Sequence, residues 1–323
     1  MTDVPMKRRG LLGLIAALPI FGRLPDAGPP SFELVPDLRA GQQWRFAFER
    51  KVVRGGAVMH WYRSPLQLRV LETDADGALL EWTEGAQTIV DAHPSRRPLL
   101  EMGLATMRDM PVLLRIDTRG RLDSLANLDT VRRHCLGWLD QMEAQWRARP
   151  ETAVIAEQMV PAMRAAYVSD AMVAASTLKE PAILLGAMGR RFGADEPVQF
   201  RTALSNPLGG DPIAAIARFA IRDVRRRAGQ ADLGWLMVSD PVATDDAARD
   251  VAAQAVALAA RAAAPDKAQA LADAAAALPP VTLEERGDFV VDTATAWPVR
   301  VTHARTVRAG AIAQVEETRF SLG

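Results

Sequence analysis

Apolar and polar residues alternate along the chain between residues 42 and 117. Trp44 and Phe46 are separated by an arginine, and the same period of two returns at residues 66–71 and 112–117. A period of two places one set of side chains on one face of a β-sheet. Stretches rich in glycine and aspartate separate the runs, as turns require. We therefore expect the first half of an antiparallel sheet, which the C-terminal residues complete.

The alternation stops at residues 86–110, where prolines favour an irregular connection across the sheet with at most one helical turn. Apolar residues then recur at spacings of three and four from Leu128 to Trp146, which predicts an amphipathic helix ending at Pro150. Further helices are expected at residues 151–163, broken or kinked by Pro161, and at residues 170–178, capped by Ser169; residues 182–188 form an apolar turn.

Strand patterns return in the second half of the chain. They are expected at residues 198–204, 213–224, 233–238, 281–285, 289–292, 299–307 and 311–320. An alanine-rich stretch at residues 244–278 predicts helix instead. Helical insertions at about 127–190 and 244–278 within an antiparallel sheet indicate an α+β fold, with residues 31–323 forming a single domain.

The first thirty residues have the pattern of an export signal followed by a linker. Lys7, Arg8 and Arg9 precede about ten apolar residues, which is the usual size of a signal core. Ten helical residues span about 15 Å, about half of a bilayer core, so the segment is too short for a transmembrane span. Residues 8–12 resemble part of the twin-arginine export motif. We expect a periplasmic or secreted bacterial protein after removal of the signal.

Charge and cysteine content narrow the function classes. Lysine and arginine together number 39, as do aspartate and glutamate, so the net charge is zero. A nucleic-acid-binding protein normally carries a basic excess, so no nucleic-acid partner is expected. One cysteine, Cys135, excludes an intrachain disulfide framework, and its place on a helical apolar stripe favours an inert buried thiol.

The sequence carries no recognised catalytic, metal or cofactor motif. The four histidines do not lie at metal-ligand spacing, and no glycine-rich nucleotide loop or G-x-S-x-G serine motif occurs. No catalytic residue, metal or cofactor is therefore assigned. His303 shares strand parity with apolar neighbours and is more often a satisfied core residue than a base. The hydrolase alternative pairs His303 with Asp292 or Glu316.

Methionines and tryptophans are the remaining candidates for a site. Eight of the 12 methionines lie between residues 102 and 188. They fit an adaptable core or a deformable apolar pocket better than a copper site, because histidines are not interleaved with them. The expected ligand-binding residues are Trp44, Phe46, Trp61, Trp82, Trp138, Met142, Met159, Met163 and His303.

Three local patterns, at residues 38–46, 113–125 and 292–301, resemble those of uncharacterised exported bacterial β-rich proteins. The third is similar to their Asp…Thr-Gly-x-Pro hairpins, with Ala296 in place of the usual glycine. The resemblance implies an architecture like the half-barrel of lipoprotein carriers, in which helices cover a curved, partly closed sheet. It transfers no catalytic residues to this chain.

Three functions remain open at this point. The first is a non-enzymatic periplasmic protein that binds a hydrophobic, lipid-like ligand or an envelope protein. The second is a hydrolase with an unrecognised site, and the third is a purely structural envelope protein. An apolar pocket favours the first function, converging titratable groups favour the second, and a filled interior favours the third.

Overall fold

The structure of the protein is a computed structural model, and some positions are not described. It describes residues 31–323 except for 95, 108–109, 149, 194–196, 205–212, 226–228, 243, 251–252, 254–268, 271, 274–275 and 278. The export segment predicted at residues 1–30 therefore lies outside the described residues. Most of the helical insertion predicted at 244–278 does so too, although residues 244–250 are helical.

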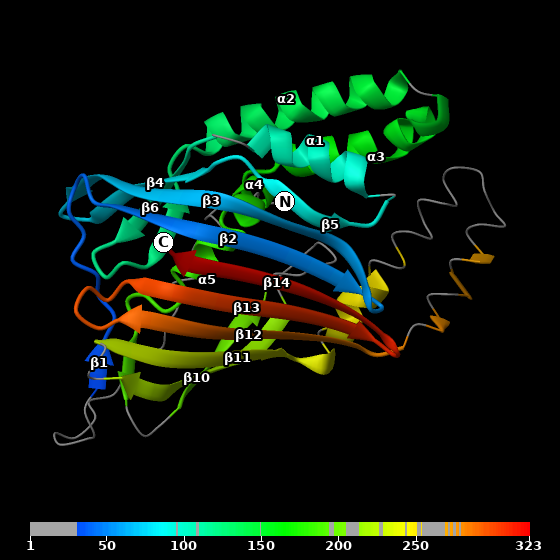
Figure 1. The fold of residues 1–323 in the computed structure, drawn as a ribbon. Helices are drawn as coiled ribbons and strands as arrows, with labels where there is room; N and C mark the ends of the chain where they lie inside the picture. Colours follow the sequence, from blue (N-terminus) through cyan, green and yellow to red (C-terminus); the bar gives the residue numbers. More distant parts are fainter. Residues whose placement is uncertain are drawn as a thin grey trace, which may run out of the picture.

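Twelve strands form one antiparallel sheet, which confirms the expected α+β fold with a curved sheet (Figure 1). Their order is β7-β6-β4-β3-β2-β14-β13-β12-β11-β10-β9, with β5 pairing additionally with β3. Among the described strands the path ends at β7 and β9, so the sheet is open. The strands are β2 (Gln43–Arg54), β3 (Ala57–Asp74), β4 (Gly77–Glu84), β5 (Thr88–Ala92), β6 (Val112–Asp117), β7 (Leu122–Leu125), β9 (Val198–Leu204), β10 (Ile213–Arg225), β11 (Gln230–Ser239), β12 (Val281–Asp292), β13 (Pro298–Ala309) and β14 (Ile312–Leu322).

The last strand of the chain, β14, pairs with β2, the first strand of the large sheet. The first and last strands of this sheet in sequence are therefore neighbours near its middle (Figure 1). Phe320 lies opposite Phe48 in this pairing. The register places alternate apolar residues of the two strands on the same face, where they contact each other. The expected completion of the sheet by C-terminal residues is confirmed. A separate two-stranded sheet joins β1 (Ser31–Glu33) to β8 (Arg191–Gly193).

Strand alternation gives the large sheet an apolar face and a polar face. On β2, Phe46 and Phe48 are 2% and 1% exposed. Arg45, which precedes Phe46, and Ala47, which lies between the two phenylalanines, are exposed. We call the buried face the inner face and the other the outer face. Burying each large apolar side chain contributes roughly 1.5–3 kcal/mol, so the inner face holds the main core of the domain.

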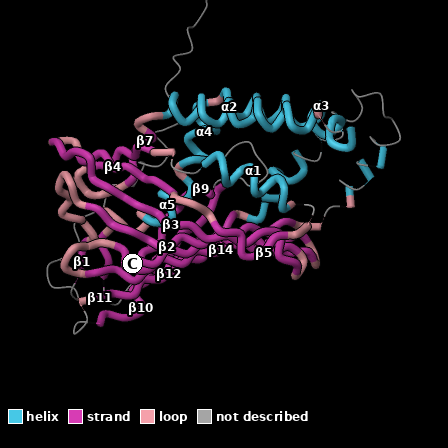
Figure 2. Tube along the Cα trace, turned by 45° about the horizontal axis from the view of Figure 1, so that its top comes forward, coloured by secondary structure: helices cyan, strands magenta, loops and turns pink. Residues whose placement is uncertain are grey.

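The helices lie on one side of the strands, except that α5 lies apart from the others and next to the strands (Figure 2). Buried residues of α2 recur at helical spacing, which confirms the predicted amphipathic helix. The Ser169 side chain accepts a hydrogen bond from Met172 N at 3.4 Å, so it caps α4 as expected. The helices are α1 (Arg97–Met107), α2 (Leu128–Arg147), α3 (Pro150–Val168), α4 (Asp170–Thr177) and α5 (Lys179–Leu184).

Three expectations about element boundaries were wrong. Residues 86–110 hold β5 and α1 rather than an irregular connection. Pro161 lies inside α3 without breaking it, because Ala156 and Val160 pack this helix against α2; a kink at Pro161 stays a prediction. Gly287 does not divide β12, since the strand continues through it from Val281 to Asp292. In each case tertiary packing outweighs a local breaker signal.

No helix among the described residues is both long enough and apolar enough to cross a membrane. Among the same residues, no group of three or more His, Cys, Asp or Glu side chains is arranged to hold a metal ion.

Candidate functional site: a polar band on the inner face

Two rows of cross-strand neighbours interrupt the apolar inner face of the sheet. The first row, from β11 to β3, consists of Trp235, Gly287, His303, Thr318, Arg50 and Tyr62. The second row consists of Met237, Glu285, Arg305, Glu316, Val52 and His60. Cross-strand neighbours of one row point to the same face of a sheet. The two rows therefore form one continuous surface made of side chains from six strands. We call this surface the polar band.

Helix α5 places two charged side chains against the polar band. Lys179 Nζ donates to both carboxylate oxygens of Glu316, at 2.7 and 2.8 Å. Arg50 Nη1 donates to Glu180 Oε1 at 2.9 Å, and Arg50 Nη2 lies 2.6 Å from Glu316 Oε1. The four groups form a network in which two cations balance two carboxylates, as buried charges require.

The pKa values in this network reflect both burial and pairing. Burial alone would raise the pKa of Glu316, but Arg50 and Lys179 outweigh it and lower the pKa to about 2. Burial is also the largest influence on Lys179, followed by Arg50, and its pKa is lowered. The depressed pKa of Glu316 means that its contribution to stability is present above about pH 4.5 and is lost as the pH falls toward 2.

A second cluster of polar groups surrounds His303 on the polar band. His303 Nε2 lies 3.1 Å from Glu285 Oε2, and Arg305 Nε donates to the other oxygen of Glu285 at 2.5 Å. Burial would raise the pKa of Glu285, but the hydrogen bond with His303 and the charge of Arg305 lower it. The Trp235 ring stacks on the His303 ring, with centroids 5.6 Å apart. The histidine is therefore held on both its edge and its face.

This geometry does not assemble the histidine pair of the hydrolase hypothesis. The partner of His303 is Glu285, whereas Glu316 binds Lys179 and Arg50. Asp292 instead accepts hydrogen bonds from the backbone N–H groups of a turn, at 2.8 and 2.9 Å. His303 is 4% exposed, and its Nδ1 has no hydrogen-bond partner among the described residues. A nucleophile bonded to the imidazole, which such a mechanism needs, is not found in this part of the chain.

A small pocket lies between the end of α4 and the start of α5, against β4 and β6. Its volume is about 60 Å³. Pockets for small-molecule ligands usually measure about 300–1,000 Å³, so this one has room for only a few water molecules. The lining residues are Trp82, Glu84, Met110, Val112, Ser176, Thr177, Glu180 and Pro181.

Glu84 is a carboxyl group without a cationic partner in this pocket. Ser64 Oγ donates to it at 3.4 Å. Burial first, and the charge of Glu180 second, raise the pKa of Glu84 to about 7. The folded protein therefore holds a proton that the unfolded chain releases between about pH 4.5 and 7, so this group makes the fold less stable as the pH rises through that window.

Replacing Glu84 with glutamine is expected to remove this pH dependence. The free energy of unfolding of Glu84→Gln should exceed that of the wild type by a margin that grows by about 1–3 kcal/mol between pH 5 and pH 8. Urea denaturation at both pH values measures it. The control is Glu81→Gln, on the outer face of the same strand. Its difference in free energy of unfolding from the wild type should change by less than about 0.5 kcal/mol between pH 5 and pH 8. An equal margin for Glu84→Gln at both pH values would refute the assignment.

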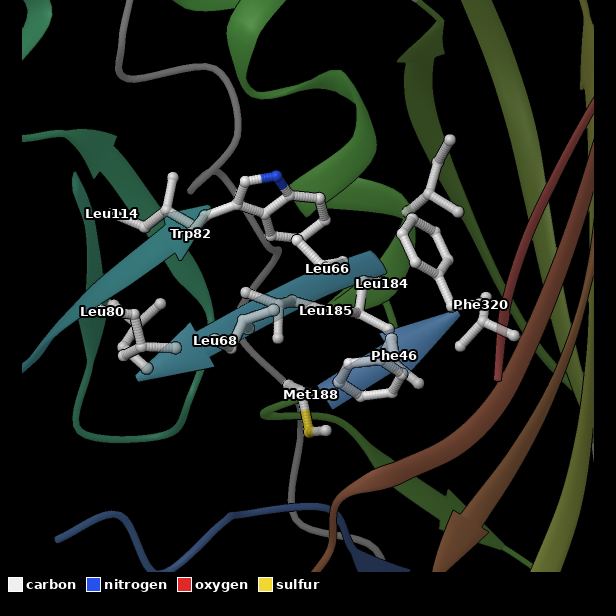
Figure 3. Packing of buried hydrophobic residues seen from close by; sticks show 14 of the residues in the cluster. Phe46, Leu66, Leu68, Leu80, Trp82, Leu114, Leu184, Leu185, Met188 and Phe320 are labelled. Carbon is white, nitrogen blue, oxygen red and sulfur yellow. The ribbon is translucent and has the colours of Figure 1, made fainter. Parts of the chain in front are cut away.

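The predicted ligand-binding residues fall in separate places. Phe46 and Trp82 lie in the core on the inner face (Figure 3). Trp44 lies at the edge of that core, where its ring stacks on Trp297 at 3.9 Å. Trp61 lies on the outer face, with the cations of two neighbouring side chains 4.9 and 5.3 Å from its ring. His303 lies on the polar band.

The helical candidates form a second, smaller cluster between α2 and α3. Trp138, Met142 and Met163 belong to this cluster, and Met142 is fully buried. Met159 lies in α3, but its side chain is outside the described residues. The nine predicted residues therefore do not line one pocket. The inner face and the α2–α3 interface are distinct apolar regions.

Sequence reasoning missed Arg50, Lys179 and Glu180, although one signal for Arg50 is present. Arg50 continues the parity of Phe46 and Phe48 on β2, so alternation alone places a charged group on the buried face. A buried arginine needs a carboxylate partner. The sequence gives no comparable signal for Lys179 and Glu180, because their role depends on where α5 packs.

Comparison of the sequence with protein-family models finds no matching family, and comparison with curated proteins finds no match. Among solved structures, one described as "Lipid-protein interactions in lipovitellin" aligns with 88% of this chain and 25% of its own chain. The sequence identity is 6% and the TM-score is 0.42. The chain thus spans about a quarter of the chain it aligns with. This TM-score is too low to relate the two folds, so the likeness bears on neither fold nor function.

Proposed function

We propose that the protein is a non-enzymatic, exported bacterial protein that binds a hydrophobic, lipid-like ligand on the inner face of its sheet. The observation that carries the proposal is that a short segment of the chain, rather than a second sheet or a long helix, packs on this face. Its centre is covered by residues 179–188, a short helix and the turn after it, which we call the covering segment. Leu184, Leu185 and Met188 of this segment face Phe46 and the neighbouring core residues (Figure 3).

An acyl chain of ordinary length can replace the covering segment on the sheet, because the two bury similar amounts of apolar surface. Its large apolar side chains, Ile183, Leu184, Leu185 and Met188, are at most 7% exposed. Burying four such side chains contributes roughly 6–12 kcal/mol in total, and each buried methylene of an acyl chain about 0.8 kcal/mol. An acyl chain of roughly 8–15 carbons therefore offsets the loss of the segment from the sheet.

Competition between the covering segment and a ligand makes a testable prediction. Leu184→Ala weakens the segment's hold on the sheet without removing any sheet residue, so we expect it to bind a fluorescent twelve-carbon fatty acid at least tenfold more tightly than the wild type. Leu184→Val removes less apolar area and should give a smaller gain in the same direction. Fluorescence titration measures all three affinities.

Val168→Ala is the matched control, because Val168 is 62% exposed on α3 and away from the sheet. Its affinity for the probe should equal that of the wild type. Probe binding that is no tighter in Leu184→Ala and Leu184→Val than in the wild type would show that the covering segment and the ligand do not compete for one face.

A purely structural envelope protein is the second candidate function. The observation that favours it is that the covering segment fills the centre of the inner face, with Leu184 fully buried. A structural protein has no ligand to admit, so neither the wild type nor the Leu184 variants would bind the fatty acid. The same titration therefore separates the two functions.

A further inference from the structure

Four buried polar atoms in the first row of the polar band have no hydrogen-bond partner among the described residues. They are Trp235 Nε1, His303 Nδ1, Thr318 Oγ1 and Arg50 Nε. Thr318 and His303 are 0% and 4% exposed. Buried polar atoms are nearly always hydrogen-bonded in native proteins, so four in one row indicate unused binding capacity at this place. Both the tryptophan and the arginine atom are donors, which favours an acceptor-rich group.

From β11 to β2, the neighbouring row of the inner face is apolar. It runs through Leu233, Phe289, Val301, Phe320 and Phe48. A polar row beside an apolar row makes the inner face amphiphilic along the strand direction. Strand residues two apart are about 7 Å apart, which is the scale of a lipid headgroup beside its first chain carbons.

The covering segment has the same polarity as the face beneath it. Its first residues, Lys179 and Glu180, bind Glu316 and Arg50 of the polar band. Its later residues, from Ile183 to Met188, are apolar and contribute to the main core. The segment thus occupies the face as an amphiphile would, with a charged end on the polar band and an apolar end beyond it.

The charges that the segment supplies define the headgroup that can replace it. When the segment leaves, Arg50 loses a carboxylate partner and Glu316 loses an ammonium partner. Arg50 and Glu316 stay paired with each other at 2.6 Å, but each loses one of its two charged partners. A ligand that restores the second partner of both carries an anionic oxygen and an ammonium close together. We propose that the ligand is a zwitterionic amphiphile whose headgroup carries a phosphate beside a hydrogen-bonding ammonium, as phosphoethanolamine does. This inference rests on the proposed function.

Hydrogen bonding decides which ammonium fits. Lys179 Nζ donates to both oxygens of Glu316, at 2.7 and 2.8 Å, which a trimethylammonium without N–H groups cannot do. On the anionic side, Arg50 Nε and Thr318 Oγ1 remain as unused donors for the further oxygens of a phosphate. A phosphoglycerol headgroup supplies the anion but restores only one partner: Glu316 keeps Arg50 and loses the ammonium that Lys179 provided.

Three lipids of equal chain length test the inference on the full chain. Dioctanoyl phosphatidylethanolamine is expected to bind roughly tenfold or more tightly than the phosphatidylcholine and phosphatidylglycerol of the same chains, as measured by calorimetric titration. Glu316→Gln should remove the preference for phosphatidylethanolamine over phosphatidylglycerol. Glu317→Gln, the next residue on the outer face of β14, should keep it.

The possible outcomes separate this inference from the proposed function. Equal binding of the three lipids by the wild type would overturn the headgroup inference while the proposed function stands. Binding of none of them would overturn both. The wild-type comparison decides the matter even if Glu316→Gln does not fold. A preference that survives Glu316→Gln would assign the headgroup to another part of the molecule.

Discussion

Replacing Arg50 with methionine is expected to lower the free energy of unfolding by about 3–5 kcal/mol. The substitution keeps an apolar stem of similar length but leaves Glu180 and Glu316 without their shared cation, and removing one partner of a buried ion pair costs about this much. Urea denaturation followed by tryptophan fluorescence at pH 7 measures the loss.

Arg63→Met provides the matched control for Arg50→Met. Arg63 lies on the outer face of the adjacent strand, is paired with Glu49 at 2.6 Å, and its side chain is 57% exposed. Exposed ion pairs contribute about 0–1 kcal/mol, so the control should lose no more than that. Glu180→Gln added to Arg50→Met should restore part of the lost stability. Equal losses for Arg50→Met and Arg63→Met would show that the network on the polar band is not effectively buried.

Replacing Gly287 with alanine is expected to destabilise the protein by about 2–4 kcal/mol. A Cβ atom at this position would lie 1.4 Å from Trp235 Nε1 and 2.2 Å from Trp235 Cδ1, so the indole ring must move. Overpacking of this kind costs about 1–3 kcal/mol, and loss of a ring stack about 0.5–1.5 kcal/mol more. The displaced ring is the one that stacks on His303. Thermal and urea denaturation measure the effect.

Gly137→Ala is the control for this substitution. Nothing lies within 4 Å of a Cβ atom at Gly137, which is in the middle of α2. Alanine favours helix over glycine by about 0.5–1 kcal/mol, so this variant should be slightly more stable than the wild type. A Gly287→Ala variant as stable as the wild type would mean that the Trp235 ring does not cover β12 in solution.

The fold was predictable where side-chain periodicity carries the signal. The alternation of Phe46 and Phe48 with polar neighbours identifies β2, and the spacing from Leu128 to Trp146 identifies α2, because both reflect burial of one face. Pro161 and Gly287 led to wrong predictions of a helix break and a strand break, because a breaker residue is a local signal. The packing of α3 on α2 and of Trp235 on β12, which outweighs that signal, involves residues far apart in the sequence. Packing partners are absent from local sequence.

The candidate site was less predictable than the fold. Parity already assigns Trp61 to the outer face, since Leu66 and Leu68 of the same strand face inward. Helical spacing showed that Met142 is buried, but periodicity does not reveal whether it faces the sheet or α3. The polar band depends on the register of six strands and on where α5 packs. Register follows from the whole sheet, so no single stretch of sequence reports it.

Native mass spectrometry of the protein, expressed with residues 1–30 in a bacterial host and purified from the periplasmic fraction, tests the central claim most directly. We expect a chain shortened at its N-terminus that carries a hydrophobic molecule, released on denaturation and recovered by organic extraction. Leu68→Asp, which places a charge on the fully buried inner face, should carry none. A wild-type chain whose mass is that of the polypeptide alone, and which takes up no dioctanoyl lipid on incubation, would contradict ligand binding on the inner face.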